Sequence, residues 1–197
     1  MTRALLRRLR HDERGVTLIE FAVVAPVMLL LLMGMCDLAY QSYVQAMLSG
    51  ALQKAGRDSS IQGSANRSAA IDAKVMNAVR AVAANATFTS SRQSYANFGQ
   101  VAPEPFQDNN NNGQYDKASE CFTDVNGNNQ WDQDPGSSGQ GGANDVVVYK
   151  MTATYPRLFP MAGMMGWSSM QSVSAQTILK NQPYANQASY TVKQVCP

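Results

Sequence analysis

The stretch RGVTLIEFAVVAPV, residues 14–27, decides how the rest of the chain is interpreted. It opens an apolar run that continues to Met35, and a run of about twenty residues is long enough to cross the hydrocarbon core of a bilayer as a helix. Glu20 stands near the start of this run, although an unpaired carboxylate is costly in lipid. The stretch therefore predicts a membrane helix and leaves open what compensates the charge of Glu20.

Charge is distributed unevenly around this run. Met1–Arg14 contains five arginines, whereas Phe21–Cys36 contains no charged side chain. A basic segment before an apolar run is typical of a cleaved secretory signal, a lipoprotein signal or a membrane anchor. No A-x-A cleavage pattern follows the run, and bulky Met35 precedes Cys36 where a lipoprotein needs a small residue. We therefore expect a membrane anchor with its arginine-rich end in the cytoplasm and the chain after about residue 40 outside.

Composition sets broad limits on the remainder. The chain has 197 residues, of which 45% are hydrophobic, and a formal net charge of +2. This length allows one modest globular domain and an accessory element. The chain beyond the apolar run has no arginine- or lysine-rich stripe with interleaved aromatic residues, so we expect no nucleic-acid partner.

The helical pattern continues past the apolar run. After Asp37, apolar residues recur at three- and four-residue steps with polar residues between them. These apolar positions are Leu38, Tyr40, Val44, Met47, Leu48, Ala51, Leu52 and Ala55. Gly56 follows them, and glycine is common where a helix ends. We therefore predict one helix over residues 16–56 that is apolar in its first half and amphipathic in its second.

The segment Gly15–Phe21, GVTLIEF, resembles the processing site of type IV pilin-like proteins, in which a prepilin peptidase cuts after the glycine and a glutamate is fifth in the mature chain. Glu20 is the fifth residue counted from Val16. The continuation as far as Arg57 resembles the TadE-like minor pseudopilins of the tight-adherence (Flp) pilus. Phe21 departs from the tyrosine often found in Flp pilins. Val16 departs from the phenylalanine typical of type IVa and type II secretion pilins, which favours the tight-adherence branch.

This resemblance implies cleavage between Gly15 and Val16, so that residues 1–15 are a leader peptide and residues 57–197 a periplasmic or extracellular domain. Cleavage would give Val16 a free ammonium group on the same helical face as Glu20. In pilin assembly the partner of this glutamate is thought to be the amine of a neighbouring subunit, and pairing makes a buried carboxylate tolerable. The resemblance thus implies that Glu20 is an assembly residue; the alternative is a side chain that reaches back to the cytoplasmic interface.

The same resemblance implies a set of partners and a location. The partners are prepilin peptidase, other pilins and pseudopilins, the pilus assembly platform and the membrane itself. The location is the bacterial inner membrane, crossed once, with the possibility of incorporation into an extracellular pilus.

The sequence that follows the long helix predicts an α+β fold for the external domain. Residues 69–85 carry helix formers with apolar positions at helical spacing, which indicates a second helix. Segments 87–94, 144–155 and 172–179 alternate as strands do. Strands at this spacing after two helices favour a small antiparallel sheet packed on the helical part. The apolar connection 156–167 is expected to pack against the domain's own core, with docking of a partner as the less common alternative.

A long Asn/Gly/Asp-rich loop, residues 108–142, contains two related copies: DNNNNGQYD at 108–116 and DVNGNNQWD at 124–132. Short oxygen-bearing side chains at alternating positions, with a sharp turn at position six, are typical of calcium-binding loops. The expected ligands are Asp108, Asn110, Asn112, Asp116, Asp124, Asn126, Asn128 and Asp132, with backbone carbonyls from Gln114 and Gln130. Both copies lack the EF-hand glutamate at position twelve, and the nearest replacement carboxylates are Glu120 and Asp134. A flexible surface loop without calcium is the alternative.

The cysteines fit an external location. Cys36 lies at the end of the apolar run, whereas Cys121 and Cys196 both belong to the exported part. Because an oxidising compartment permits disulfides, we predict a bridge between Cys121 and Cys196 that ties the asparagine-rich loop to the C-terminal segment.

We expect no enzymatic activity. His11, the only histidine, lies in the leader that cleavage would remove, and the acids cluster in the calcium-type loops rather than as an acid/base pair. The preferred interpretation is a minor pseudopilin that acts as a structural or assembly subunit of a tight-adherence pilus. The alternatives are a type II secretion pseudopilin and a signal-anchored, calcium-binding envelope protein without a pilus role.

Overall fold

The computed structural model describes residues 16–60, 67–159, 163, 166–183, 187 and 191–197. The chain divides into two compact units. The first comprises the chain up to Tyr43 together with Pro156–Gln171, and the second comprises Val44–Tyr155 together with Ser172–Pro197. Residues 1–15 of the expected leader, and with them Gly15 and His11, lie outside the described residues.

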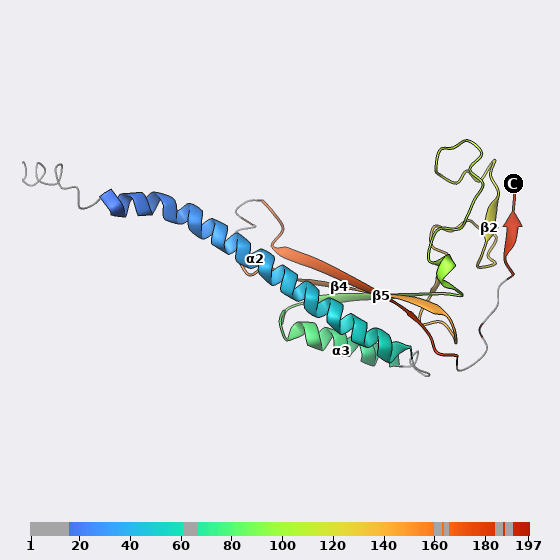
Figure 1. Ribbon diagram of the computed structural model, residues 1–197, viewed down its shortest axis with the longest axis horizontal. Coiled ribbons are helices and arrows are strands. Elements are labelled where there is room, and N and C mark those ends of the chain that lie inside the picture. The colour runs from blue at the N-terminus through green and yellow to red at the C-terminus, as the bar shows by residue number, and fades with distance from the viewer. Residues whose placement is uncertain (1–15, 61–66, 160–162, 164–165, 184–186, 188–190) are drawn as a thin grey trace, which may run out of the picture. The chain divides into compact units, whose positions relative to one another are not determined.

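The described elements are two α-helices, a short 3-10 helix and six strands (Figure 1). In chain order they are α2 (Val16–Ser59), α3 (Ser68–Arg80), β1 (Thr87–Tyr95), η3 (Phe98–Gln100), β2 (Phe122–Asp124), β3 (Ser137–Ser138), β4 (Val146–Pro156), β5 (Met170–Lys180) and β6 (Lys193–Val195). The expected α+β class, with a long N-terminal apolar helix, a second helix and small antiparallel sheets, is confirmed.

Four of the strands form the main sheet, in the order β3-β1-β4-β5. Strand β1 runs antiparallel to β4, with the register extending from Thr87 opposite Thr154 to Tyr95 opposite Val146. Strands β2 and β6 form a separate antiparallel pair. The sequence pattern predicted β1, β4 and β5, whereas β2, β3 and β6 have only two or three residues each, too few to show an alternation.

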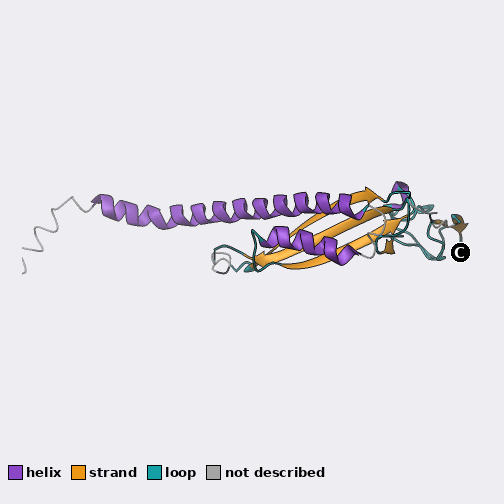
Figure 2. Ribbon diagram, turned by 90° about the horizontal axis from the view of Figure 1, so that it is seen from below, coloured by secondary structure: helices purple, strands orange, loops and turns teal. Residues whose placement is uncertain are grey.

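The core of the second unit lies between one face of this sheet and the helices. Alternate residues of β4 are buried, as its alternating pattern predicts. Helix α3 contributes Ile71, Val75 and Val79, which recur every four residues and therefore share one face. The C-terminal turns of α2 contribute Val44, Leu48, Leu52 and Ala55. Figure 2 shows α3 running alongside this part of α2.

Gly56 does not end α2, contrary to the prediction of a helix over residues 16–56, because the helix continues to Ser59. Its role is close packing. A Cβ atom at Gly56 would lie 3.1 Å from Cγ2 of Thr177 on β5, so glycine lets the helix approach the strand. The expected division at residues 56 and 57 stays a prediction. The boundary between the two compact units falls within α2, at Tyr43 and Val44. The reason is that the amphipathic turns of α2 are part of the core.

A polar cluster fastens α3 to the sheet. The carboxylate of Asp72 accepts hydrogen bonds from Ser90 Oγ at 2.9 Å, from Arg92 Nη1 and Nη2 at 3.1 and 2.6 Å, and from the hydroxyl of Tyr149. The guanidinium of Arg92 also lies 3.9 Å from the ring centroid of Tyr149. Burial alone would raise the pKa of Asp72, but its hydrogen bonds from Arg92 and Tyr149 and the charge of Arg92 lower it below its usual range. Asp72 is therefore a charged group held in place by the fold.

Candidate functional site

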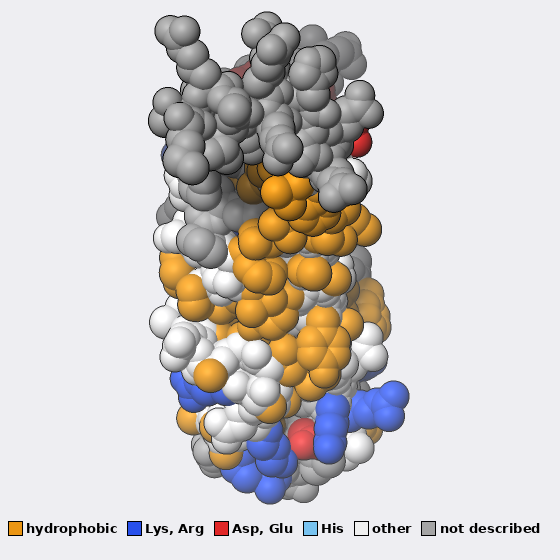
Figure 3. All heavy atoms as spheres, turned by 90° about the vertical axis from the view of Figure 1, so that its left-hand side faces the viewer, with side chains coloured by type: hydrophobic (Ala, Val, Ile, Leu, Met, Phe, Trp, Pro, Cys, Tyr) orange, Lys and Arg blue, Asp and Glu red, His pale blue; other side chains and the backbone are white. Residues whose placement is uncertain are grey.

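The N-terminal half of α2 presents an apolar surface. Its large side chains are exposed, including Leu18, Phe21 and Val23, and by length and composition the helix can cross a membrane. In the view from the N-terminal side, hydrophobic side chains cover much of the visible surface (Figure 3). A helix that is apolar all round needs lipid or other apolar helices around it. Helix α2 therefore fits a single-pass membrane anchor.

Glu20 interrupts this apolar surface. It lies in the second turn of α2, and its side chain is exposed. Val16 is the first residue of the helix, one turn before Glu20. Gly15, on the other side of the expected cleavage, lies outside the described residues, and the pairing of Glu20 with another subunit stays a prediction.

The two calcium-type loops have the same internal structure. In the first, Asn110 Nδ2 and Asn112 Nδ2 donate to Asp116 Oδ2 at 2.6 and 3.0 Å. In the second, Asn126 Nδ2 and Asn128 Nδ2 donate to Asp132 Oδ2 at 2.8 and 2.6 Å. The side chains at positions three, five and nine therefore converge in both copies.

The backbones of the two loops turn in the same way at position six. The carboxylate at position one accepts backbone N–H groups in both: Asp108 from Asn112 and Gly113, and Asp124 from Gly127 and Asn129. Position six has positive φ in both copies, 73° at Gly113 and 62° at Asn129. Asparagine is one of the few residues that adopt this left-handed conformation readily, so it replaces glycine here without loss of the turn.

Two buried glutamates hold the loops, and each clamps the loop of the other copy. Glu120, which is 0% exposed, accepts hydrogen bonds from the backbone N–H groups of Asn109 and Asp116, both at 2.9 Å. Glu104, which is 1% exposed, accepts them from Val125 at 2.8 Å and Asp132 at 2.9 Å. Because both carboxylate oxygens are satisfied, burial of these charges is tolerated. The glutamates join the second and ninth residues of each loop.

Aromatic residues at equivalent positions form a small core between the copies. Tyr115 and Trp131 stack with their ring centroids 5.2 Å apart. Phe106 and Phe122 form an isolated antiparallel bridge, and each also makes an edge contact with Tyr115. The two loops are thus one paired module rather than two separate turns.

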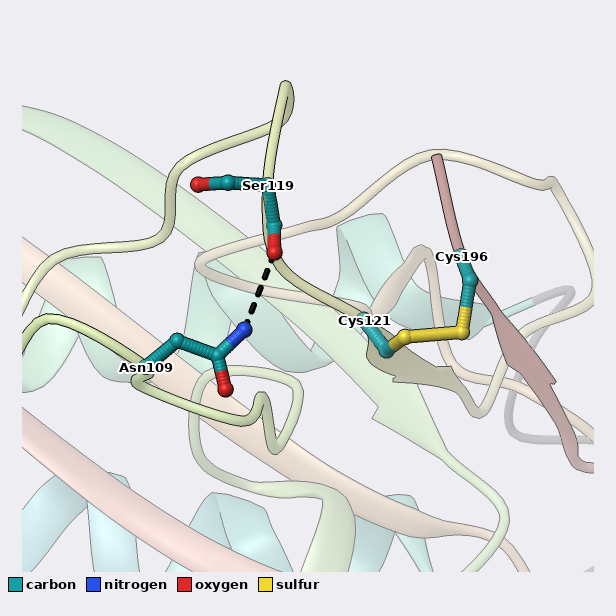
Figure 4. Close-up of a disulfide and its surroundings, with 4 residues drawn as sticks. All are labelled: Asn109, Ser119, Cys121 and Cys196. Atoms are coloured by element: carbon teal, nitrogen blue, oxygen red, sulfur yellow. Dashed lines mark hydrogen bonds between the residues drawn. A yellow bond between two sulfur atoms is a disulfide. The ribbon is translucent and has the colours of Figure 1, made fainter.

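The predicted disulfide between Cys121 and Cys196 is present and closes this module against β6 (Figure 4). Cys121 directly follows Glu120, and the adjoining β2 pairs with β6 from Phe122 opposite Val195 to Asp124 opposite Lys193. Beside the bridge, Asn109 Nδ2 donates to the carbonyl of Ser119 at 2.9 Å (Figure 4). Cys36 is a free, exposed cysteine.

The sequence pattern contained a signal for Glu104, Phe106 and Phe122 that the prediction did not use, whereas Glu120 was already named as a replacement carboxylate of the first loop. The repeat is longer than the calcium motif: EPFQDNNNNGQYD at 104–116 aligns with ECFTDVNGNNQWD at 120–132. Glutamate and phenylalanine recur at the same offset of sixteen as the loop residues. Only the tertiary structure shows that Glu104, which precedes the first loop in the chain, holds the second loop.

The other suggested replacement carboxylate, Asp134, is engaged elsewhere. It accepts a hydrogen bond from the hydroxyl of Tyr95 at 2.7 Å and one from Gly136 N at 3.1 Å. Among the described residues, no group of three or more His, Cys, Asp or Glu side chains is arranged to hold a metal ion. Each loop offers two aspartates and two asparagine amides instead.

An ion pair organises the first unit. Arg157 Nη1 lies 2.5 Å from Asp37 Oδ2, and the two side chains are 22% and 16% exposed. Arg157 also donates from Nε to the carbonyl of Ser168 at 3.1 Å and from its backbone N–H to that of Ser169 at 3.0 Å. The connection between β4 and β5 is therefore fastened to α2 at Asp37. Leu158 and Trp167 on this connection are exposed rather than packed in a core.

Comparison with known proteins finds similarity in one part of the chain. The family model described as TadE-like protein matches residues 15–57. These residues begin immediately before α2 and end two residues before its last residue. No curated protein and no solved structure matches the chain. The matched segment suggests a protein associated with the tight-adherence pilus, and the sheet and paired loops lie outside it.

Proposed function

We propose that this protein is a minor pseudopilin, a structural or assembly subunit of a tight-adherence pilus in the bacterial inner membrane. The observation that carries the proposal is the coincidence of the TadE-like match, residues 15–57, with the long apolar helix α2. A family resemblance confined to an apolar helix fits a family whose members have in common insertion into the membrane and assembly with other subunits. The described sheet and loops would then be the part specific to this subunit.

In this proposal prepilin peptidase cuts between Gly15 and Val16 and leaves α2 with a free amine at its first residue. Glu20 lies one helical turn further and is exposed on an otherwise apolar surface. In a filament or in the membrane, the amine of a neighbouring subunit would pair with Glu20 and compensate the cost of its burial. The arginine-rich leader would lie in the cytoplasm and the sheet domain in the periplasm.

The test compares Glu20→Ala and Glu20→Gln with the unaltered protein in cells that contain the pilus system. Because the proposed partner is an amine, both variants should be processed and folded but should assemble at least tenfold less, which corresponds to about 1.4 kcal/mol. Mass spectrometry of the mature N-terminus reports processing, and co-purification with pilus components reports assembly. Normal assembly of both variants would contradict charge pairing, and an intact leader would contradict the pilin proposal itself.

The two alternative functions are less well supported. A type II secretion pseudopilin would also have a processed apolar helix, but the segment matched here is TadE-like. An anchored envelope protein without a pilus role would retain the anchor and lack pilus partners. Co-purification with tight-adherence pilus components therefore separates the preferred function from both alternatives. The mature N-terminus separates the two alternatives from each other, because only the type II secretion pseudopilin is processed. In each of the three the protein acts as a structural rather than a catalytic component.

We also propose that the paired loops bind calcium, as a second, stabilising property of the external domain. The favouring observation is that side chains at positions three, five and nine converge in both copies on an equivalent point. Rotation of the asparagine amides would present two amide oxygens and the aspartates to a cation. The same rotation would release the backbone N–H groups that these amide oxygens accept, so metal–oxygen contacts must offset that loss. Gln114 and Gln130 would add backbone carbonyls at position seven. Without an EF-hand glutamate the expected affinity is weak, on the order of 10⁻⁴ to 10⁻³ M.

A further inference from the structure

The connection between β4 and β5 carries exposed apolar side chains next to the end of the apolar part of α2. Leu158 is 52% exposed, Trp167 is 61% exposed, and Met170, the first residue of β5, is 42% exposed. All three belong to the same compact unit as the N-terminal part of α2. Large apolar side chains left exposed within one compact unit are typical of an interaction surface.

The ion pair fixes where this surface lies on α2. Asp37 is the first charged residue after Glu20, and the seventeen residues from one to the other rise about 26 Å along the helix, close to the thickness of about 30 Å of a hydrocarbon core. If Glu20 lies near one edge of the bilayer, Asp37 lies near the other. Arg157 is bonded to Asp37, so the connection lies at the second edge too.

The chemistry of the connection suits that depth. Arg157 neutralises the carboxylate of Asp37, and charge compensation is what a carboxylate at the border of a bilayer requires. The carbonyl of Ser168 accepts a hydrogen bond from Arg157 Nε, and Trp167 directly precedes Ser168 in the chain. Trp167 is therefore the neighbour of a residue that is bonded to the ion pair. Tryptophan is enriched at the headgroup level because its ring is apolar and its N–H is polar.

We propose that the β4–β5 connection is a second membrane contact, which inserts Trp167 and Leu158 into the lipid interface at the side of the membrane opposite Glu20. The partner is the lipid surface itself. The Arg157–Asp37 pair is the positioning element, since it holds the connection beside the point where α2 leaves the bilayer. This inference rests on the proposed membrane anchoring of α2, and it goes beyond the matched segment because Arg157, Leu158 and Trp167 lie outside residues 15–57.

The experiment uses the full chain with Trp131→Phe, which leaves Trp167 as the only tryptophan. The protein is reconstituted in phosphatidylcholine vesicles that are unbrominated, brominated near the carbonyl end of the acyl chain, or brominated near its terminal methyl. We expect the fluorescence of Trp167 to be quenched by bromine, more strongly at the shallow position, and to be protected from aqueous iodide. Arg157→Gln should reduce this quenching, whereas Arg80→Gln on α3 is the matched control and should not.

Each other outcome overturns the inference in an identifiable way. If the protein floats with the vesicles but Trp167 is quenched by iodide and not by bromine, the anchor stands and the connection is in water. If Trp167 is protected from both quenchers, the surface contacts protein, such as a second copy of this chain, rather than lipid. If the protein does not float with vesicles at all, the proposed anchor fails and the inference fails with it.

Discussion

Asp72 shows how a single residue can join helix and sheet. Its carboxylate lies on α3 and accepts hydrogen bonds from Ser90 and Arg92 on β1 and from Tyr149 on β4. The side chains of Asp72 and Arg92 are 15% and 8% exposed, so each of these two charges is compensated by the other. The hydroxyl of Tyr149 has a raised pKa, first because of burial and then because it donates to Asp72. The cluster is therefore a fixed arrangement of charges in the core.

Replacement of this carboxylate should be costly at neutral pH and less costly in acid. We expect Asp72→Asn to lower the free energy of unfolding by about 3 kcal/mol at pH 7, because it leaves Arg92 buried without its counter-charge. The folded-state pKa of Asp72 is lowered, so its contribution is present above the unfolded pKa of about 4 and is lost as the pH falls through the folded value. The difference between variant and parent should therefore shrink below pH 4. Urea unfolding followed by circular dichroism measures both differences, and Asp58→Asn, at an exposed ion pair, is the control.

At the scale of elements, the paired loops combine rigid and adaptable parts. The backbone is held by Glu104, Glu120 and the disulfide, while the asparagine and aspartate side chains inside each loop bond to one another. A cation would replace these internal bonds with metal–oxygen contacts. Calcium should therefore stabilise the module without a change of fold.

This predicts a calcium-dependent melting temperature for the full chain in detergent. When free calcium equals the dissociation constant of a site, binding raises the free energy of unfolding by about 0.4 kcal/mol. At ten times that concentration the total increase is about 1.4 kcal/mol. Asp116→Asn combined with Asp132→Asn should abolish the difference between calcium and chelator, whatever the variant does to the absolute melting temperature. Magnesium should have a smaller effect because it requires tighter octahedral geometry. Equal melting in calcium and chelator, with no heat of calcium binding, would leave the module as a structural pair of loops.

For the whole molecule, the boundary between the two units leads to a prediction about truncation. The side chains of Val44, Leu48 and Leu52 are fully buried in the second unit, although they belong to the helix that begins at Val16. At about 1.5 to 3 kcal/mol each, they contribute an amount on the order of 5 kcal/mol or more, comparable to the total stability of about 5 to 15 kcal/mol of a typical domain.

A chain that begins at Val44 should therefore fold, and a chain that begins at Arg57 should not. Both are exported behind the same cleavable signal, so that the disulfide can form in each. Cooperative urea unfolding and resistance to proteolysis are expected of the first fragment alone. A cooperative transition in the shorter fragment would show that the sheet, α3 and the paired loops form a sufficient core.

Sequence pattern by itself determined the features that depend on short-range chemistry. An uninterrupted apolar run determines the apolar helix α2, three- and four-residue steps determine α3, and alternation determines β4. Loop residues at fixed spacing indicated a sharp turn at position six of both copies, where Gly113 and Asn129 have positive φ. The Cys121–Cys196 bridge was predictable because an oxidising compartment permits disulfides and because only these two of the three cysteines belong to the exported part.

Tertiary structure alone decided what joins distant segments. The sequence predicts a helix that ends at Gly56, but α2 continues to Ser59, packs against β5 at Gly56 and contributes its last turns to the core. The hydrogen bonds of Glu104 to the second loop and the ion pair of Arg157 with Asp37 likewise have no local signature. The physical reason is that side-chain periodicity reports which face of an element is apolar, whereas a buried charge finds its partner only when the folded chain brings the two together.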